Sequence, residues 1–229
     1  KFANAGKQVG KKDLALQASV LTQLGRIYAA GGQTARAKEC YANAYSLNRR
    51  LGQTEEQIDV LNLLSVLAAE TGQLQAAIAF GDQALQLAAD GSDRLTETRI
   101  RIRLGRLNMA RGDTSVALDH FAKGVALAEV VGQPALAAQA LAAQAAAQVQ
   151  LNDSGAQSTF RKALGQARAA GDAAAEANAA IGLGQLLIAQ GARVEGGQML
   201  QEASAAARRM GPRGVAIARR ADELLINMG

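Results

Sequence analysis

The feature that most constrains this chain is a repeat of about forty residues. Five small residues, each next to a leucine or its equivalent, are separated by 40, 40, 40 and 39 positions: Gly25, Ser65, Gly105, Ala145 and Gly184. A turn position follows seven residues after each of them, at Gly32, Gly72, Gly112, Asn152 and Gly191. A second turn closes each unit, at Gly52, Gly91, Gly132, Gly171 and Gly211. Three sets of markers with one period predict a stack of similar structural units.

Each unit is predicted to be a pair of α-helices. Only two of 229 residues are proline, and the sequence is rich in Ala, Leu, Gln, Glu and Arg, which lose little side-chain freedom in a helix. The second half of each unit carries a small, an aromatic and a small residue on one helical face. These are Ala37, Tyr41 and Ala44; Ala117, Phe121 and Gly124; and Ala156, Phe160 and Ala163. The second unit has Ala77, Phe80 and Ala84 with Gly81 in the aromatic place, and the fifth has Gly196, Leu200 and Ala203. We expect the small residues to let paired helices approach closely and the aromatic residue to fill the space between pairs.

This pattern resembles the tetratricopeptide repeat. That family places an apolar residue, Leu, Gly and an aromatic residue on its first helix, which here are Leu21, Leu24, Gly25 and Tyr28. Its usual period is 34 residues, so the units here resemble the longer variants of kinesin light chains, spindle-orientation scaffolds and bacterial peptide-sensing regulators. The resemblance implies an all-α, right-handed superhelical solenoid of antiparallel helix pairs. HEAT-type arrays have a similar period but lack the small–aromatic–small second helix.

The repeat predicts the organisation of the whole chain. We expect five repeats at residues 14–53, 54–93, 94–133, 134–172 and 173–212, and a capping helix, or the first helix of a sixth unit, at 213–229. Residues 1–13 are expected to end a preceding repeat, because Phe2-Ala3-Asn4-Ala5 matches Tyr41-Ala42-Asn43-Ala44. The chain is therefore expected to be part of a longer solenoid. The fourth repeat departs most, with Gln144 and Gln148 at places that are normally apolar.

The sequence offers little for catalysis, which needs titratable groups converging in a pocket. The single histidine, His120, lies beside Phe121 and is expected to be solvated or partly packed, and the single cysteine, Cys40, to be a small apolar residue. Residues 6–11 (GKQVGK) are one residue too short for a phosphate-binding loop and are followed by Lys12 where Ser or Thr is needed. We predict no enzyme activity, no cofactor and no metal. No stretch of about 18 apolar residues is present, so no membrane partner is expected and the cytoplasm is the default location.

A partner is expected in the concave face, which the first helices line. Positions at fixed offsets from each Leu-Gly pair should face this groove, and amide and guanidinium groups recur there. Such groups can bond a peptide backbone and acidic side chains. The predicted groove residues are Arg26, Asp59, Asn62, Arg99, Ile102, Arg106, Gln139, Asn178 and Gln185. The same offsets add Ser19, Thr22, Val66, Ala142, Ala146 and Ile181.

Charge differs between repeats. Residues 54–93 hold seven acids and no Lys or Arg, whereas residues 94–133 hold seven bases and four acids. Arg99, Arg103 and Arg106 share one helix face. This face is interpreted as a clamp for acidic groups of a ligand, as a solvated face, or as part of a pair between repeats such as Asp59 with Arg99.

The leading functional hypothesis is an interaction scaffold that binds an acidic or amide-rich peptide. A sensor segment of a larger bacterial regulator and a self-associating array are alternatives. The use of Arg over Lys and the abundant Ala hint at a bacterial source. Nucleic-acid binding is prompted by the net charge of +5 but disfavoured, because the acidic second repeat interrupts any basic track.

Overall fold

The computed structural model describes residues 2–91 and 93–228, and their side chains from residue 10 onward. Every regular element in this part of the chain is a helix, as the composition predicts. The elements are α1 (Phe2–Ala30), α2 (Thr34–Leu51), α3 (Thr54–Glu70), α4 (Leu74–Asp90), α5 (Arg94–Arg111), α6 (Thr114–Val130), α7 (Pro134–Gln150), α8 (Ala156–Ala170), α9 (Ala173–Ala189), α10 (Arg193–Arg209), the 3₁₀ helix η1 (Gly211–Gly214) and α11 (Val215–Ile226).

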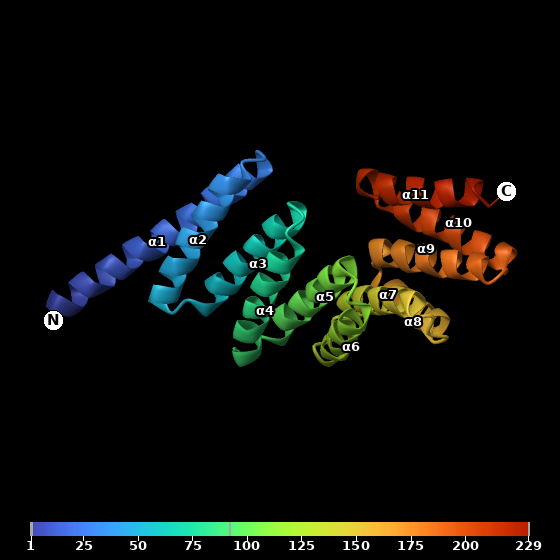
Figure 1. Ribbon diagram of the computed structural model, residues 1–229, viewed down its shortest axis with the longest axis horizontal. Helices are drawn as coiled ribbons and strands as arrows, with labels where there is room; N and C mark the ends of the chain where they lie inside the picture. Colours follow the sequence, from blue (N-terminus) through green and yellow to red (C-terminus); the bar gives the residue numbers. More distant parts are fainter. Residues whose placement is uncertain (1, 92, 229) are drawn as a thin grey trace. The chain divides into compact units, whose positions relative to one another are not determined.

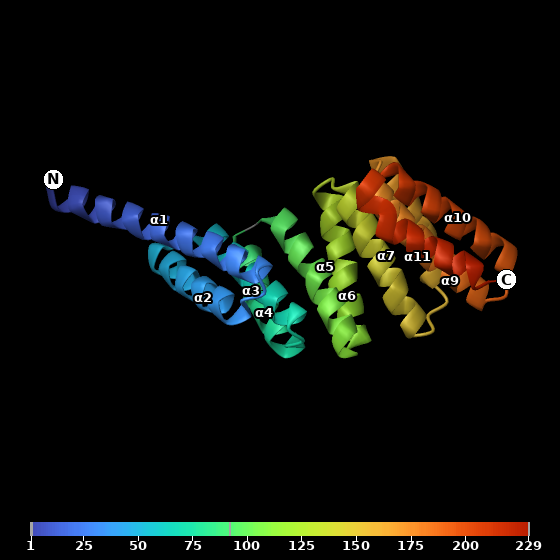
Figure 2. The same ribbon diagram turned by 90° about the horizontal axis from the view of Figure 1, so that it is seen from above.

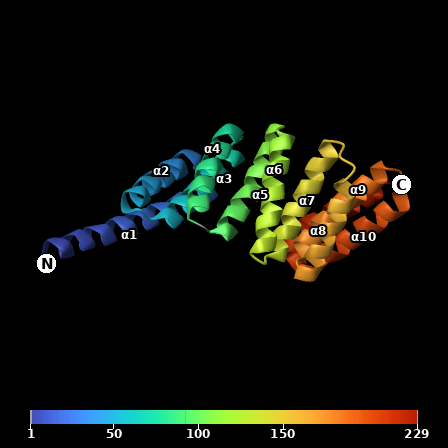
Figure 3. The ribbon, with the colours of Figure 1, turned by 90° about the horizontal axis from the view of Figure 1, so that it is seen from below.

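The helices form two compact units, residues 1–100 and 101–229, and α5 crosses the division. In the first unit α1 packs on α2 and α3 on α4 (Figure 1). In the second unit α7 pairs with α8 (Figure 3), and α10 lies between α9 and α11 (Figure 1). The fold is therefore all-α with sequential helices in adjacent pairs, the packing of a tetratricopeptide-like solenoid. The right-handed superhelical course and the division into repeats stay predictions.

The small residues of the repeat lie where the helices of a pair touch. A methyl group added at Gly25 on α1 would lie 2.4 Å from Cε1 of Tyr41 on α2, and one at Gly105 on α5 would lie 2.4 Å from Cε1 of Phe121 on α6. In the fifth repeat, Gly184 on α9 lies against the backbone carbonyl of Gly196 on α10. The close approach predicted for these positions is therefore present in both units. The aromatic side chain, however, fills the space inside its own pair in the first and third repeats, not only the space between pairs.

The second and fourth repeats keep the contact without glycine. Ser65 is fully buried on α3, and its hydroxyl donates a 2.8 Å hydrogen bond to the carbonyl of Ala77 on α4. Ala145 is fully buried at the matching place on α7. In this fourth repeat Phe160 on α8 instead contacts Gly182 on α9, between two pairs. The amide nitrogen of Gln148 donates a 2.9 Å hydrogen bond to Asp153, while its amide oxygen is buried without a hydrogen-bond partner.

The predicted turn positions have the expected backbone. Gly32, Gly72, Gly112 and Gly191 all have positive φ, and Asn152, which replaces glycine in the fourth repeat, has φ 54°. Asparagine tolerates this left-handed conformation better than most residues. Gly91 is the exception among the closing turns, with φ −81°.

Helix α1 differs from the expected boundary at residues 13 and 14. It runs without a turn from Phe2 to Ala30 and extends past the end of its partner α2 (Figure 2). Residues 10–13 are exposed. The side chains of Phe2-Ala3-Asn4-Ala5 and of Gly6 to Val9 lie outside the described side chains.

Candidate functional site

A pocket of about 940 Å³ lies in the second unit. Helices α7 and α9 form its walls, and α5, α8 and α11 each contribute one residue, which are Arg106, Phe160 and Arg220. The walls are mostly small: Ala142, Ala143, Ala146, Ala174, Ala175 and Ala189. These alanine side chains are too short to fill the space between α7 and α9, so the pocket stays open.

The polar groups of this pocket are amides and guanidinium groups. Gln139 and Gln150 lie on α7, and Asn178 and Gln185 on α9. Arg106 and Arg220 come from the first and last helices that line the pocket, and both are exposed. None of the residues that line it is acidic. The pocket can therefore donate many hydrogen bonds and favours a ligand with carbonyl or carboxylate oxygens.

Arg103, one turn before Arg106 on α5, is half-buried. Burial, together with the neighbouring positive charge of Arg106, holds the pKa of Arg103 below its ordinary value. Burial and the charge of Arg106 both disfavour the positive charge on Arg103. A ligand carboxylate beside Arg106 would weaken the repulsion between the two arginines.

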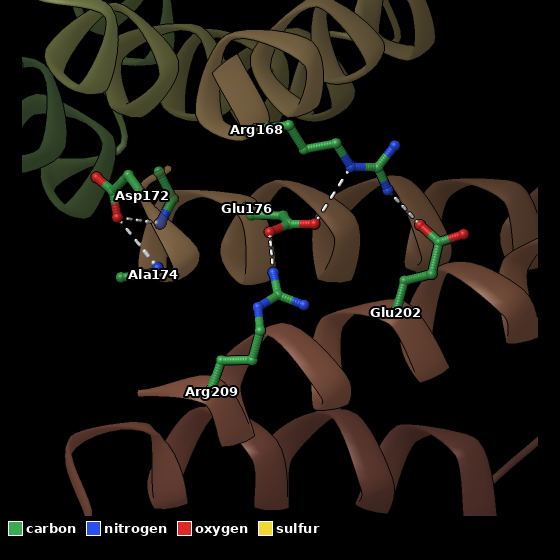
Figure 4. Close-up of polar contacts among 7 residues, drawn as sticks. Arg168, Asp172, Ala174, Glu176, Glu202 and Arg209 are labelled. Atoms are coloured by element: carbon green, nitrogen blue, oxygen red, sulfur yellow. Dashed lines mark hydrogen bonds and ion pairs between the residues drawn. The ribbon is translucent and has the colours of Figure 1, made fainter. Parts of the chain in front are cut away.

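Helix α9, which forms one wall, is fixed in place by polar contacts on its other sides. Asp172 accepts hydrogen bonds of 3.1 and 3.0 Å from the backbone amides of Ala174 and Ala175, which caps the start of α9 (Figure 4). Glu176 accepts a 3.2 Å hydrogen bond from Arg168 on α8 and a second one from Arg209 on α10. These contacts hold three consecutive helices together next to the pocket.

The predicted groove residues separate into three groups. Arg106, Gln139, Asn178 and Gln185 line the 940 Å³ pocket together with Ala142, Ala146 and Ile181. In the first unit, Arg26 and Asp59 line a smaller pocket of about 250 Å³ with Ser19 and Thr22. Asn62 and Arg99 line neither pocket; Asn62 is half-buried and Arg99 is exposed.

Ile102 lines neither of these two pockets. It is only 4% exposed and belongs to the apolar core of the second unit with Val125 and Ala140. Ile102 lies three residues before Gly105. The residues at the same place in other repeats, Thr22, Ala142 and Ile181, line pockets. Ile181, at the same offset, is 2% exposed and belongs to the same apolar core, yet it lines the 940 Å³ pocket.

Arg220 and Gln150 are polar pocket residues that sequence reasoning missed. Continuing the glycine series by 39 residues from Gly184 reaches Glu223, and the residue three positions before it is Arg220. That offset supplies pocket residues in earlier repeats, so the same rule finds Arg220 once α11 is taken as the first helix of a sixth unit. Phe160 was assigned only to the core, yet it also lines the pocket while being 4% exposed.

Two kinds of site are not seen in the described residues. Among residues 10–91 and 93–228, no three His, Cys, Asp or Glu side chains are grouped so that they could hold a metal ion. Within the described helices none combines the length and apolar character of a membrane span. His120, the one histidine, is half-buried on α6.

Comparison with known proteins supports the repeat assignment. Residues 16–90 match the family model of the tetratricopeptide repeat. No curated protein matches the chain in sequence.

Solved structures of similar fold cover most of the chain. BtubC (BKLC) from P. vanneervenii has a TM-score of 0.76 at 16% identity, over 91% of this chain and 88% of that one. A putative kinesin light chain from Podospora anserina with nearly identical TPR-like repeats has a TM-score of 0.66 at 17% identity, over 87% and 98%. The Rap conjugation gene regulator of plasmid pLS20, in complex with the Phr* peptide, has a TM-score of 0.58 at 16% identity, over 93% and 63%.

Identities this low show the fold alone. The helix pairs, the glycine contacts and the family match at residues 16–90 agree with one another. Residues 16–90 match the tetratricopeptide repeat, and the fold of the chain is similar to that of tetratricopeptide-like solenoids.

Proposed function

We propose that this chain is a protein-interaction scaffold that binds an extended segment of a partner protein in the 940 Å³ pocket of its second unit. The observation that carries the proposal is the lining of that pocket, which combines small apolar walls, four amide side chains and two arginines with no acidic residue. An extended peptide offers backbone oxygens for the amides, while Arg106 and Arg220 favour acidic side chains.

The role is non-catalytic. A pocket that holds no paired acid and base binds its ligand without a proton-transfer step. The fold neighbours agree with a binding role, since the pLS20 regulator was solved in complex with a peptide. That complex also favours the second candidate, in which the chain is the sensor segment of a larger regulator. We keep the cytoplasm as the proposed location.

The proposal is tested by selecting peptides from a random phage-displayed library on the purified chain. Synthetic copies of the selected peptides are then titrated by fluorescence anisotropy against three proteins: the wild type, Arg106→Glu/Arg220→Glu, and the control Arg193→Glu. Arg193 is exposed at the start of α10 and does not line the pocket. We expect the double variant to lose affinity by a factor of about 100 or more, because each charge-assisted hydrogen bond contributes about 1.5–3 kcal/mol.

Two outcomes are informative in different ways. Equal affinity for the double variant and the control would refute binding in this pocket. Unchanged affinity after the acidic residues of the peptide are replaced with Asn and Gln would refute the preference for acidic groups and leave the pocket in place. Nucleic acid as the ligand would appear as tight, salt-dependent binding of RNA or DNA.

Self-association is a separate role that we also propose. Light scattering over a range of protein concentrations tests it: a molar mass that rises with concentration is expected, and a constant monomer mass would refute it.

A further inference from the structure

Asn48 on α2 is a buried polar residue at a place where the other repeats have alanine. It lies seven residues after Tyr41, and the residues at the same place in the next four repeats are Ala88, Ala128, Ala167 and Ala207. These alanines are fully buried, and Asn48 itself is only 3% exposed. Its backbone carbonyl accepts a 3.0 Å hydrogen bond from Gln53, but within the described residues its side-chain amide has no hydrogen-bond partner. A buried amide without a partner lowers stability, so packing alone does not account for Asn48.

Asn48 lines the pocket of about 250 Å³ that lies within the first unit. Helices α1 and α3 form the walls of this pocket, and the turn between α2 and α3 contributes Gln53. The amide and ionised side chains that line it are Gln23, Arg26, Asn48, Gln53, Glu56 and Asp59. Amides both donate and accept hydrogen bonds, so the pocket suits a ligand that is polar over most of its surface.

The wall of the pocket on α1 is exposed in the same way as in later repeats. Ser19 and Arg26 line the pocket, and both are exposed. The residues at the same two places in the third and fifth repeats are exposed as well: Arg99, Arg106, Asn178 and Gln185. Those repeats have helices of other repeats before and after them in the chain. The exposure of these places is therefore a property of the repeat.

The two walls of the pocket carry opposite charges. Arg26 lies on α1, and Glu56 and Asp59 lie on α3. The described residues show no ion pair between Arg26 and either carboxylate. A ligand with a single charge would be attracted by one wall and repelled by the other. A ligand that carries both an ammonium group and a carboxylate meets an opposite charge on each wall.

The volume of the pocket limits this ligand to a small molecule. A water molecule takes about 30 Å³ in the liquid, so 250 Å³ holds about eight non-hydrogen atoms of that size. This is the size of a small α-amino acid such as threonine or asparagine. The amide of Asn48 can donate a hydrogen bond to the ligand carboxylate or accept one from its ammonium group, which gives the buried amide a partner.

We propose that the 250 Å³ pocket of the first unit binds a small polar α-amino acid. The ammonium group of the ligand lies beside Glu56 and Asp59, its carboxylate lies beside Arg26, and the amide of Asn48 bonds to it. This site is separate from the peptide pocket of the second unit, and neither proposal depends on the other.

Calorimetric titration of the full chain with each of the common L-amino acids tests the ligand class. We expect at least one small polar amino acid to bind with a Kd of about 1 mM or tighter. The amide of that amino acid lacks the carboxylate and its N-acetyl form lacks the ammonium group, so each should bind about tenfold more weakly or worse. The proposal is overturned if no amino acid binds at concentrations up to about 10 mM, or if either single-charge form binds as tightly as the parent.

Substitutions in the pocket separate binding from folding. Asn48→Ala restores the alanine of the other repeats, so its melting temperature should equal or exceed that of wild type, while its affinity for the amino acid should fall about tenfold or more. Asp59→Asn changes the charge of an exposed side chain and should weaken binding by a similar factor. The control is Arg49→Gln, on an exposed residue of α2 that does not line the pocket. Affinities of Asn48→Ala and Asp59→Asn that match the control would exclude this pocket as the site.

Discussion

Replacing Gly105 with alanine tests whether close helix contact is the reason for the repeated glycine. The added methyl carbon would lie 2.4, 2.7 and 2.8 Å from three ring atoms of Phe121. Carbon atoms in contact normally lie about 3.5–4.0 Å apart, so the ring or the helix has to move by about 1 Å. Phe121 is fully buried, and a close-packed interior leaves the ring no free space to enter.

The expected magnitude is the difference of two opposing effects. Alanine is favoured over glycine inside a helix by about 1 kcal/mol. Forcing an extra methyl group into a packed core costs about 1–3 kcal/mol, and three short contacts place this position near the upper limit. Gly105→Ala should therefore lower the free energy of unfolding by about 2 kcal/mol.

Gly165→Ala is the matched control in the same unit. Gly165 is exposed inside α8, and no atom lies within 4 Å of its added methyl group. This substitution should stabilise the protein by up to about 1 kcal/mol, because only the helix preference acts. Urea unfolding followed by circular dichroism measures both variants. The reasoning is refuted if Gly105→Ala is as stable as Gly165→Ala.

Three further predictions concern polar contacts. Hydrogen bonds from Thr96 hold the pKa of the Asp93 carboxyl below its usual 3.8, so the stability that Asp93 contributes is present above about pH 4 and is lost as the pH falls through the lowered value. The melting temperature of Asp93→Ala should therefore fall less than that of wild type between neutral pH and strong acid, and an equal fall would contradict this. Glu176→Gln should lower the free energy of unfolding by about 1–2 kcal/mol, because the Glu176 side chain is only 14% exposed and bonds two arginines. In urea unfolding, a loss that 1 M salt does not reduce would argue against an ionic contribution. Ser65→Ala should cost about 1 kcal/mol in thermal unfolding through loss of the buried bond to Ala77, and a neutral result would mean that this bond contributes nothing net.

The repeat was the part of the fold that the sequence could specify. Gly25, Gly105 and Gly184 recur at one period because each contact needs a residue without a bulky side chain, and that requirement leaves a direct trace in the sequence. Asn152 could be assigned to a turn for the same reason, since few residues other than glycine adopt positive φ. The long, unbroken α1 was not predicted. The repeat pattern assigned residues 2–13 to a preceding repeat, whereas a helix ends only where the sequence carries a turn signal.

The pocket was predictable only in part. Fixed offsets place a residue on a helix face, so they bring Gln139, Asn178 and Gln185 to one pocket. Offsets do not say which repeats open into the pocket: Ile102 does not line it, whereas Ile181 at the same offset does. Arg220 was missed because α11 carries no Leu-Gly pair from which to count.

Hydrogen–deuterium exchange with and without a library-selected peptide tests the central claim most directly. The claim is that the partner segment lies between α7 and α9. Bound peptide should slow amide exchange in segments covering α7 and α9 and leave α6 and α10 unchanged. Protection confined to α6, α10 or the first unit would contradict the account.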